Sequence, residues 1–225
     1  MIVAPDADDD PQRLIGRERV VAALSDSLAP GGVVALAAAS GTMHAGIGVT
    51  TTARCALNRL TSDTLVVRLR GDSEVAVQTS LVRAARALGL PEQFARQADA
   101  PRMGLVRSLR QSPAAVVWVD DVREAGLVSE LQSAVGGHVR WLVTGLPEVL
   151  GRLSPRMMVT LDPLQKSAVR ELAAGLLNDA DRQTAGVKVS LEAIEASTGS
   201  GLPAAVILEA AAMRAAGNTG RESAG

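Results

Sequence analysis

The chain has 225 residues, of which 47% are hydrophobic and 21% charged, and its net charge at pH 7 is −1. This length accommodates one α/β domain with a small accessory domain around a sizeable core. The near-zero charge excludes a general electrostatic attraction to nucleic acid or to anionic membranes. The single cysteine, Cys55, excludes an internal disulfide and is typical of a reducing compartment, so we expect a cytoplasmic protein.

The chain begins with an acidic segment. Residues 1–12 contain four aspartates and two prolines, and they lack the basic-then-apolar order of a signal peptide. We therefore expect a disordered acidic arm here. The longest apolar run, Val33–Ala39, is too short to cross a bilayer, so we expect no membrane association.

Residues 13–161 alternate between helical patterns and short apolar runs. Short apolar runs bounded by turn residues are typical of buried strands, and longer amphipathic stretches are typical of helices. The first expected helix begins near Gly16 and ends before Pro30, and three more cover Thr50–Leu60, Val75–Leu88 and Met103–Leu109. The expected strands are Val33–Leu36, Leu65–Leu69, Ala114–Val119 and Val139–Thr144. This alternation predicts an α/β fold in which helices flank a parallel sheet.

The pattern changes after Leu161, and Asp162-Pro163 marks the expected boundary. Residues 162–216 contain helical patterns without a convincing strand between them, and they predict a small all-helical subdomain. Its expected helices are Gln165–Leu177, Ser190–Ser197 and Leu202–Ala216. The small, polar residues 217–225 predict a flexible tail.

A glycine-rich segment, Gly46–Ala53, lies between an expected strand and an expected helix. This context is typical of a phosphate-binding loop, whose backbone N–H groups and following helix N-terminus bind phosphate. Val49 stands where such a loop carries its lysine, and Met43 stands where it carries its first glycine. The segment favours a nucleotide-binding fold and argues against efficient hydrolysis; the alternative is an ordinary glycine-rich turn.

A second candidate is the apolar run Val116–Val119, which ends in the paired carboxylates of Asp120 and Asp121. In a nucleotide site, one such carboxylate can hold magnesium through water and its neighbour can polarise an attacking water. The alternative is that these residues start a turn, because aspartate is common there.

The order of the motifs resembles that of the NB-ARC family, the switch ATPases of the STAND class within the AAA-like P-loop proteins. The resemblance extends over about Leu14–Met213. The matching segments are Leu14–Glu18, Gly46–Ala53, Val116–Val122, Trp141–Thr144 and Gly201–Ala205. It implies that residues 13–161 are a P-loop NTPase-like nucleotide-binding domain with ATP or ADP, and possible Mg²⁺, as cofactors.

The resemblance also implies roles for individual residues. Asp120 and Asp121 would be catalytic, and Thr50 and Asp120 would hold the metal. The residues implied in nucleotide binding are Ile15, Gly16 and Arg17 around the adenine, Gly46, Ile47, Gly48, Val49, Thr50 and Thr51 in the phosphate loop, and Pro203 closing over the base. Besides Val49, a second departure is Leu146, which stands where the family has a γ-phosphate-sensing arginine.

We therefore expect a degenerate nucleotide-binding module with a regulatory or scaffolding role and weak or no ATP hydrolysis. Its effector or sensor domains would come from protein partners in trans, or the chain would be a remnant. The alternative is a slow ATPase in which an arginine such as Arg54 or Arg68 replaces the missing cation. A nucleic-acid-binding regulator has the least support, because the arginines lack interleaved aromatic residues.

Overall fold

The computed structural model describes residues 2–3, 14–39, 47–61, 63–89, 99–112, 114–176 and 201–222, with the backbone alone for 2–3 and 213–222. The chain divides into two compact units. The first, the sheet unit, comprises Met1–Leu14, Arg19–Ser40 and Val49–Leu161, and the second, the helical unit, comprises Ile15–Glu18, Gly41–Gly48 and Asp162–Gly225.

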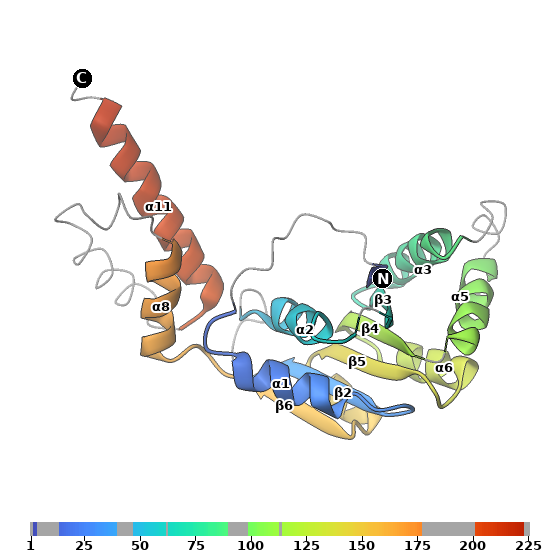
Figure 1. Ribbon diagram of the computed structural model, residues 1–225. Helices are drawn as coiled ribbons and strands as arrows, with labels where there is room; N and C mark the ends of the chain where they lie inside the picture. Colours follow the sequence, from blue (N-terminus) through green and yellow to red (C-terminus); the bar gives the residue numbers. More distant parts are fainter. Residues whose placement is uncertain are drawn as a thin grey trace. The chain divides into compact units, whose positions relative to one another are not determined.

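The described residues of the sheet unit form one six-stranded parallel sheet in the order β1-β3-β4-β5-β2-β6 (Figure 1). Its strands are β1 (Ile2–Val3), β2 (Val33–Ala38), β3 (Leu65–Arg70), β4 (Ala115–Val122), β5 (Arg140–Gly145) and β6 (Met157–Leu161). All six residues of β2 are buried, as expected for a parallel strand covered on both faces. The predicted parallel α/β fold is confirmed.

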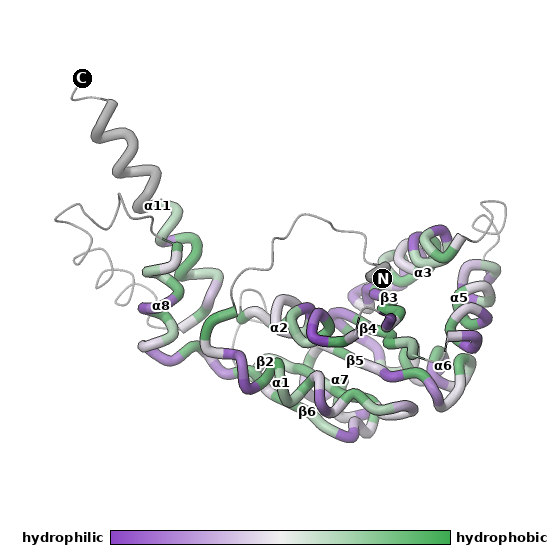
Figure 2. Tube along the Cα trace, viewed as in Figure 1, coloured by the Kyte–Doolittle hydropathy of each residue, from purple (hydrophilic) through white to green (hydrophobic). Residues whose placement is uncertain are grey.

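Helices cover both faces of this sheet. They are α1 (Glu18–Ser27), α2 (Val49–Leu57), α3 (Glu74–Ala87), α5 (Ala100–Gln111), α6 (Ala125–Val135) and α7 (Pro147–Leu150), which a 3₁₀ turn, η1 (Gly151–Leu153), extends. Apolar residues of α3, α5, α6 and α7 share one core with alternate residues of the strands. Helix α2 packs on β2 and β5, and the Ser25 hydroxyl of α1 donates to the Ala56 carbonyl of α2. Figure 2 shows hydrophobic and hydrophilic residues interspersed along α1 and α3, as in amphipathic helices.

Five elements of the sheet unit have no counterpart among the expected helices and strands: β1, α6, α7, η1 and β6. Helix α6 follows Glu124, whose side chain makes no capping hydrogen bond, so the sequence lacks the usual start signal. Strand β6 lies at an edge, and its residues alternate between partial burial and exposure. Ile2 and Val3 pair with Val66 and Val67 of β3, although the sequence placed them in a disordered arm. Two β-branched residues make a strand here because an existing sheet edge receives them.

The helical unit contains α8 (Lys166–Leu176) and α11 (Pro203–Glu222) among its described residues. The two helices share an apolar core with Ile15, formed further by Leu164, Ala168, Val169, Ala173, Val206 and Ala210. Helix α11 continues through Glu222, whereas the predicted helix ends at Ala216. The predicted helix Ser190–Ser197 lies outside the described residues. None of the helices in the described part of the chain has the length and apolarity that a bilayer crossing needs.

Candidate functional site

The sheet topology brings three chemically distinct side chains to neighbouring strands. Because the strands are parallel, residues in register lie side by side on the same face. Arg68 of β3 is in register with Trp118 of β4, and Asp120 lies two residues further along β4 on that face. Thr144 of β5 lies two residues beyond Leu142, which is in register with Trp118. The result is a polar cluster toward the carboxyl ends of β3, β4 and β5.

Asp120 is the centre of this cluster and is 6% exposed. Its Oδ1 atom accepts a hydrogen bond from the Thr144 hydroxyl at 2.6 Å, and its Oδ2 atom accepts one from Nη2 of Arg68, also at 2.6 Å. The Thr50 hydroxyl, in the first turn of α2, lies 3.2 and 3.3 Å from the two carboxylate oxygens. A buried carboxylate requires such partners, because burial without them destabilises the charged form.

Arg68 is held in place by more than its ion pair. Its guanidinium lies over the Trp118 ring, 4.5 Å from the ring centroid, which is a cation–π geometry. The side chains of Arg68 and Asp120 are 12% and 8% exposed, so this pair is largely removed from solvent. An arginine within the apolar strand LVVRLR is therefore part of the site rather than a surface charge.

A β-bulge places Asp121 differently from Asp120. The register of β4 and β5 shifts between Val119 and Val122, and Asp121 has a left-handed backbone with φ of 57°. Its N–H donates to the Thr144 hydroxyl at 3.0 Å. Its carboxylate is 42% exposed and forms an ion pair with Arg123, with Nε 3.1 Å from Oδ1. The two predicted catalytic aspartates are thus adjacent in sequence, but their carboxylates pair with different arginines.

Two glycines make room for the bulge. A Cβ atom on Gly145 would lie 2.6 Å from the Val122 carbonyl oxygen, and one on Gly71 would lie 3.0 Å from the Val122 Cα. The Gly71 N–H also donates to the Asp120 carbonyl at 2.7 Å. Side chains at these two positions would push β4 away from its neighbours, so both glycines help to position Asp120 and Asp121.

The first turn of α2 carries Val49, Thr50 and Thr51. The first N–H groups of a helix have no partner within the helix, and the dipole makes this end attractive to anions. Gly48, with φ of 88°, immediately precedes the helix. Val49 and Thr50 are half-buried and Thr51 is exposed, whereas the predicted Gly46 lies outside the described residues.

The other predicted nucleotide-binding residues belong to the helical unit. Ile15 packs in its core, and Ile47 is fully buried. Arg17 is buried, and its Nη2 donates to the Asp162 carbonyl. Burial lowers the pKa of the Arg17 guanidinium, and the negative charge of Asp162 acts in the opposite direction.

Pro203 is the first residue of α11, where its lack of an N–H is harmless. A Cβ atom on Gly48 would lie 4.0 Å from its Cγ, so these two predicted residues are neighbours in the helical unit. Gly16 is packed closely against α8: a Cβ atom there would lie 2.8 Å from that of Ala168. The roles of Gly16 and Pro203 around an adenine stay predictions, as do those of Ile15 and Arg17.

The residues at this cluster do not fit Mg²⁺ well. Thr50 and Asp120, the two predicted ligands, do lie together, but both carboxylate oxygens already accept short hydrogen bonds and one of them carries the Arg68 cation. A metal would have to approach that positive guanidinium closely, because Mg²⁺ binds its ligands at about 2.0–2.1 Å. Among the described residues, no group of three or more acidic, histidine or cysteine side chains is arranged to hold a metal.

Arg54, the other candidate for a replacement cation, lies in the last turn of α2, away from the first turn that carries Thr50. The sequence indicates Thr144 only as a strand residue. The available signal for both Arg68 and Thr144 was a polar side chain within an otherwise apolar strand of a parallel sheet, where both faces are covered.

Comparisons with solved structures show the fold. The ADP form of the ORC2 protein from Aeropyrum pernix aligns with a TM-score of 0.65 and 16% identity, over 97% of this chain and 67% of that one. The ORC1 protein from the same organism, solved in complex with DNA, aligns with a TM-score of 0.53 and 19% identity, over 94% of this chain and 68% of that one. A STAND protein with a tetratricopeptide repeat sensor from Pyrococcus horikoshii aligns with a TM-score of 0.50 and 15% identity, over 88% of this chain and 30% of that one.

Neither the protein-family models nor the curated proteins gave a match to this chain. Membership of the NB-ARC family therefore stays a prediction. At identities below 20%, the structural likeness concerns the backbone arrangement alone. It shows that the chain has the parallel α/β fold of the P-loop NTPases.

Proposed function

We propose that this protein is a nucleotide-binding module that holds ADP or ATP with little or no hydrolysis and acts as a regulatory or scaffolding component. The observation that carries this proposal is the Thr50–Asp120–Arg68 cluster. It joins the loop-helix hydroxyl to the strand carboxylate, as in a nucleotide site, but an arginine neutralises the carboxylate.

The start of α2 supports phosphate binding. Free backbone N–H groups, the positive end of the helix dipole and the Thr50 hydroxyl all favour an anion there. Arg68 offsets the negative charge of Asp120 within the same cluster, so that the carboxylate repels an anion less. The fold supports the same conclusion by analogy, because the similar ORC2 protein was solved with ADP and with ADPNP.

Several features argue against hydrolysis. Phosphoryl transfer depends on cations and on a carboxylate that can orient water. Val49 supplies no charge at the start of α2, and Leu146 supplies none after β5. Asp120 is bound to Arg68, and Asp121 is bound to Arg123, so each predicted catalytic carboxylate already has a cationic partner.

Two measurements test the proposal. Denaturing the purified protein is expected to release ADP or ATP, or calorimetry is expected to show ADP binding to the nucleotide-free protein. ATP turnover is expected to equal that of matched Asp120→Asn and Asp121→Ala variants. Turnover that either substitution removes would favour the slow ATPase instead. In that alternative, Arg68 would release Asp120 and contact the phosphate. If denaturation releases no nucleotide and calorimetry shows no binding of added ADP, only the scaffolding role would remain.

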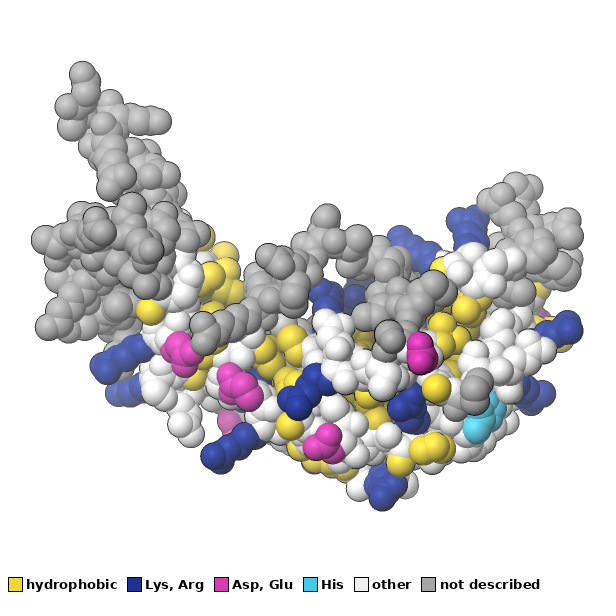
Figure 3. Space-filling view, in the orientation of Figure 1, with side chains coloured by type: hydrophobic (Ala, Val, Ile, Leu, Met, Phe, Trp, Pro, Cys, Tyr) yellow, Lys and Arg dark blue, Asp and Glu magenta, His cyan; other side chains and the backbone are white. Residues whose placement is uncertain are grey.

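We propose protein partners rather than nucleic acid for this module. The net charge is −1, and Arg and Lys side chains are spread over the face drawn in Figure 3, with Asp and Glu among them. Nucleic-acid binding instead relies on clustered basic charge and weakens steeply with salt. Fluorescence anisotropy with labelled duplex DNA at low salt is expected to show no saturable binding, and salt-sensitive saturable binding would contradict this part of the proposal.

A further inference from the structure

We propose that Arg68 is the resident counter-ion of Asp120 and takes the place of magnesium, so that this site binds a nucleoside di- or triphosphate without a divalent cation. The nucleotide part of this inference rests on the proposed function. The part that concerns Arg68 and Asp120 rests on the geometry of the cluster alone.

The partners of Asp120 compensate its negative charge without a metal. Its Oδ2 atom lies 2.6 Å from Nη2 of Arg68, and its Oδ1 atom lies 2.6 Å from the Thr144 hydroxyl. Charge-assisted bonds of this length are among the stronger ones in proteins. A divalent cation at the same carboxylate would have to displace the guanidinium or approach it against strong repulsion.

Arg68 is positioned as a fixed component of the site. The Trp118 ring lies beneath its guanidinium, and the β3–β4 register places the two residues side by side. Arg68 is therefore held from two directions, by an aromatic face and by a carboxylate. Its Nε atom is also buried without a hydrogen-bond partner among the described residues, so the group retains a donor that an anionic oxygen would satisfy.

The same strand provides a matched control. Arg70 lies two residues beyond Arg68 in β3 and forms its own ion pair, with Asp72 at 3.1 Å. Its side chain is 57% exposed, whereas that of Arg68 is 12% exposed. Removing Arg70 takes away the same charge from the same strand but leaves Asp120 neutralised.

The first experiment uses Mn²⁺ alone, followed by electron paramagnetic resonance, and needs no nucleotide. The wild type and Arg70→Gln are expected to leave Mn²⁺ free. Arg68→Gln is expected to create one Mn²⁺ site, with an affinity for Mn²⁺ at least about tenfold higher than that of the wild type. The added substitution Asp120→Asn is expected to remove this site. A Mn²⁺ site at Asp120 in the wild type, or none in folded Arg68→Gln, would overturn the inference.

The second experiment measures ADP binding by calorimetry in MgCl₂ and in EDTA. The dissociation constant of the wild type is expected to agree within about twofold between the two conditions. Arg68→Gln is expected to bind ADP about tenfold more weakly in EDTA and to recover affinity in MgCl₂, whereas Arg70→Gln is expected to match the wild type. Wild-type binding that tightens tenfold with Mg²⁺ would overturn the inference.

These outcomes separate the two proposals. If the wild type binds no ADP in either condition, the proposed function fails, and the Mn²⁺ experiment still decides the role of Arg68. If Arg68→Gln does not fold, Arg68→Lys keeps the charge, and it is expected to bind ADP without Mg²⁺ and to leave Mn²⁺ free. The comparison of the wild type in MgCl₂ and EDTA requires no variant at all.

Discussion

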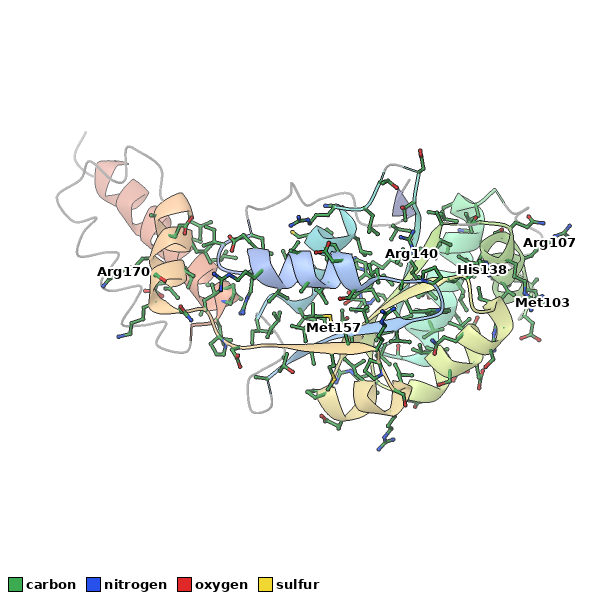
Figure 4. The ribbon with its side chains drawn as sticks, turned by 60° about the horizontal axis from the view of Figure 1, so that its bottom comes forward. Met103, Arg107, His138, Arg140, Met157 and Arg170 are labelled. Atoms are coloured by element: carbon green, nitrogen blue, oxygen red, sulfur yellow. The ribbon has the colours of Figure 1, made fainter. Side chains whose placement is uncertain are left out.

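Each end of the sheet holds a partly or largely buried arginine, and the guanidinium groups of these two arginines have different kinds of partner. At the amino end, Arg140 is the first residue of β5, and its Nη2 donates to the Ala114 carbonyl at 3.0 Å. His138 lies just before the same strand, and its Nε2 is 2.9 Å from the Leu109 carbonyl (Figure 4). Toward the carboxyl end, Arg68 instead pairs with the charged Asp120.

Under the proposed function, this difference separates a structural role from a role in nucleotide binding. At the amino end, side chains satisfy backbone carbonyls at the ends of elements, and no carboxylate is among the partners described above. At the carboxyl end, two opposite charges are buried together, which often contributes little net stability because both lose water. Such a costly arrangement at the edge where α2 begins is more readily explained by a ligand than by packing.

The largest expected effect comes from breaking the carboxyl-end pair on one side. Asp120→Ala leaves the buried Arg68 cation without its partner and deprives the Thr50 and Thr144 hydroxyls of their acceptor. We expect a loss of about 3–5 kcal/mol in the free energy of unfolding, because an unpaired buried charge is strongly destabilising. Chemical denaturation measures this loss. Asp121→Ala, at the exposed neighbour, is the control, and equal losses in the two variants would show that burial of the pair is not decisive.

Restoring the missing loop cation adds charge at the same end of the sheet. Val49→Lys places an ammonium in the first turn of α2, where a charge-assisted contact to phosphate is worth about 1.5–3 kcal/mol. We expect ATP to bind about tenfold to hundredfold more tightly, even without turnover. Calorimetry measures the change, and circular dichroism verifies the fold.

Asn58→Lys is the control for Val49→Lys, because it adds the same charge at an exposed position just beyond the carboxyl end of α2. It is expected to alter affinity by less than about threefold. An unchanged affinity in folded Val49→Lys would mean that the start of α2 no longer binds phosphate.

The sheet and its main helices could be predicted because their signals are local. Runs such as Val33–Leu36 and Leu65–Leu69 are apolar over strand-like lengths, and the structure extends each by one or two residues. Strand β6 and helix α6 carried weaker signals, since β6 is a half-exposed edge and α6 lacks a capping side chain. Ile2–Val3 became a strand only through pairing with β3.

The candidate site was predictable in its position but not in its electrostatics. The order of the motifs indicated that Thr50 and Asp120 belong to one site, and the structure brings them to 3.2 Å. The pairing of Arg68 with Asp120 depends on which strand lies beside β4, and strand order is not a local property. The bulge that separates Asp120 from Asp121 depends likewise on close packing against Gly71 and Gly145.

A smaller effect is expected at the amino end of the sheet. Arg140→Met keeps most of the apolar stem but removes the hydrogen bond to the Ala114 carbonyl and a longer one, of 3.5 Å, to the Thr64 hydroxyl. We expect a loss of about 1 kcal/mol in the free energy of unfolding and no change in ADP affinity, because the partners are neutral. A loss as large as that of Asp120→Ala, or a change in nucleotide affinity, would erase the distinction between the two ends.

The smallest effect is expected for the exposed ion pair on the bulge. Arg123 forms two contacts of 3.1 Å with the Asp121 carboxylate, but the two side chains are 50% and 42% exposed. Solvent and salt screen such a pair, so Arg123→Ala is expected to cost less than about 1 kcal/mol of stability. The bulge itself should persist, because the Thr144 hydroxyl still accepts the Asp121 N–H and Gly71 still bonds the backbone of β4.

If Asp121 is the water-activating residue of a slow ATPase, releasing it from Arg123 should raise ATP turnover. Under the proposed function turnover stays at the level of the Asp121→Ala control, so a measurable gain in Arg123→Ala would identify Arg123 as the group that restrains catalysis.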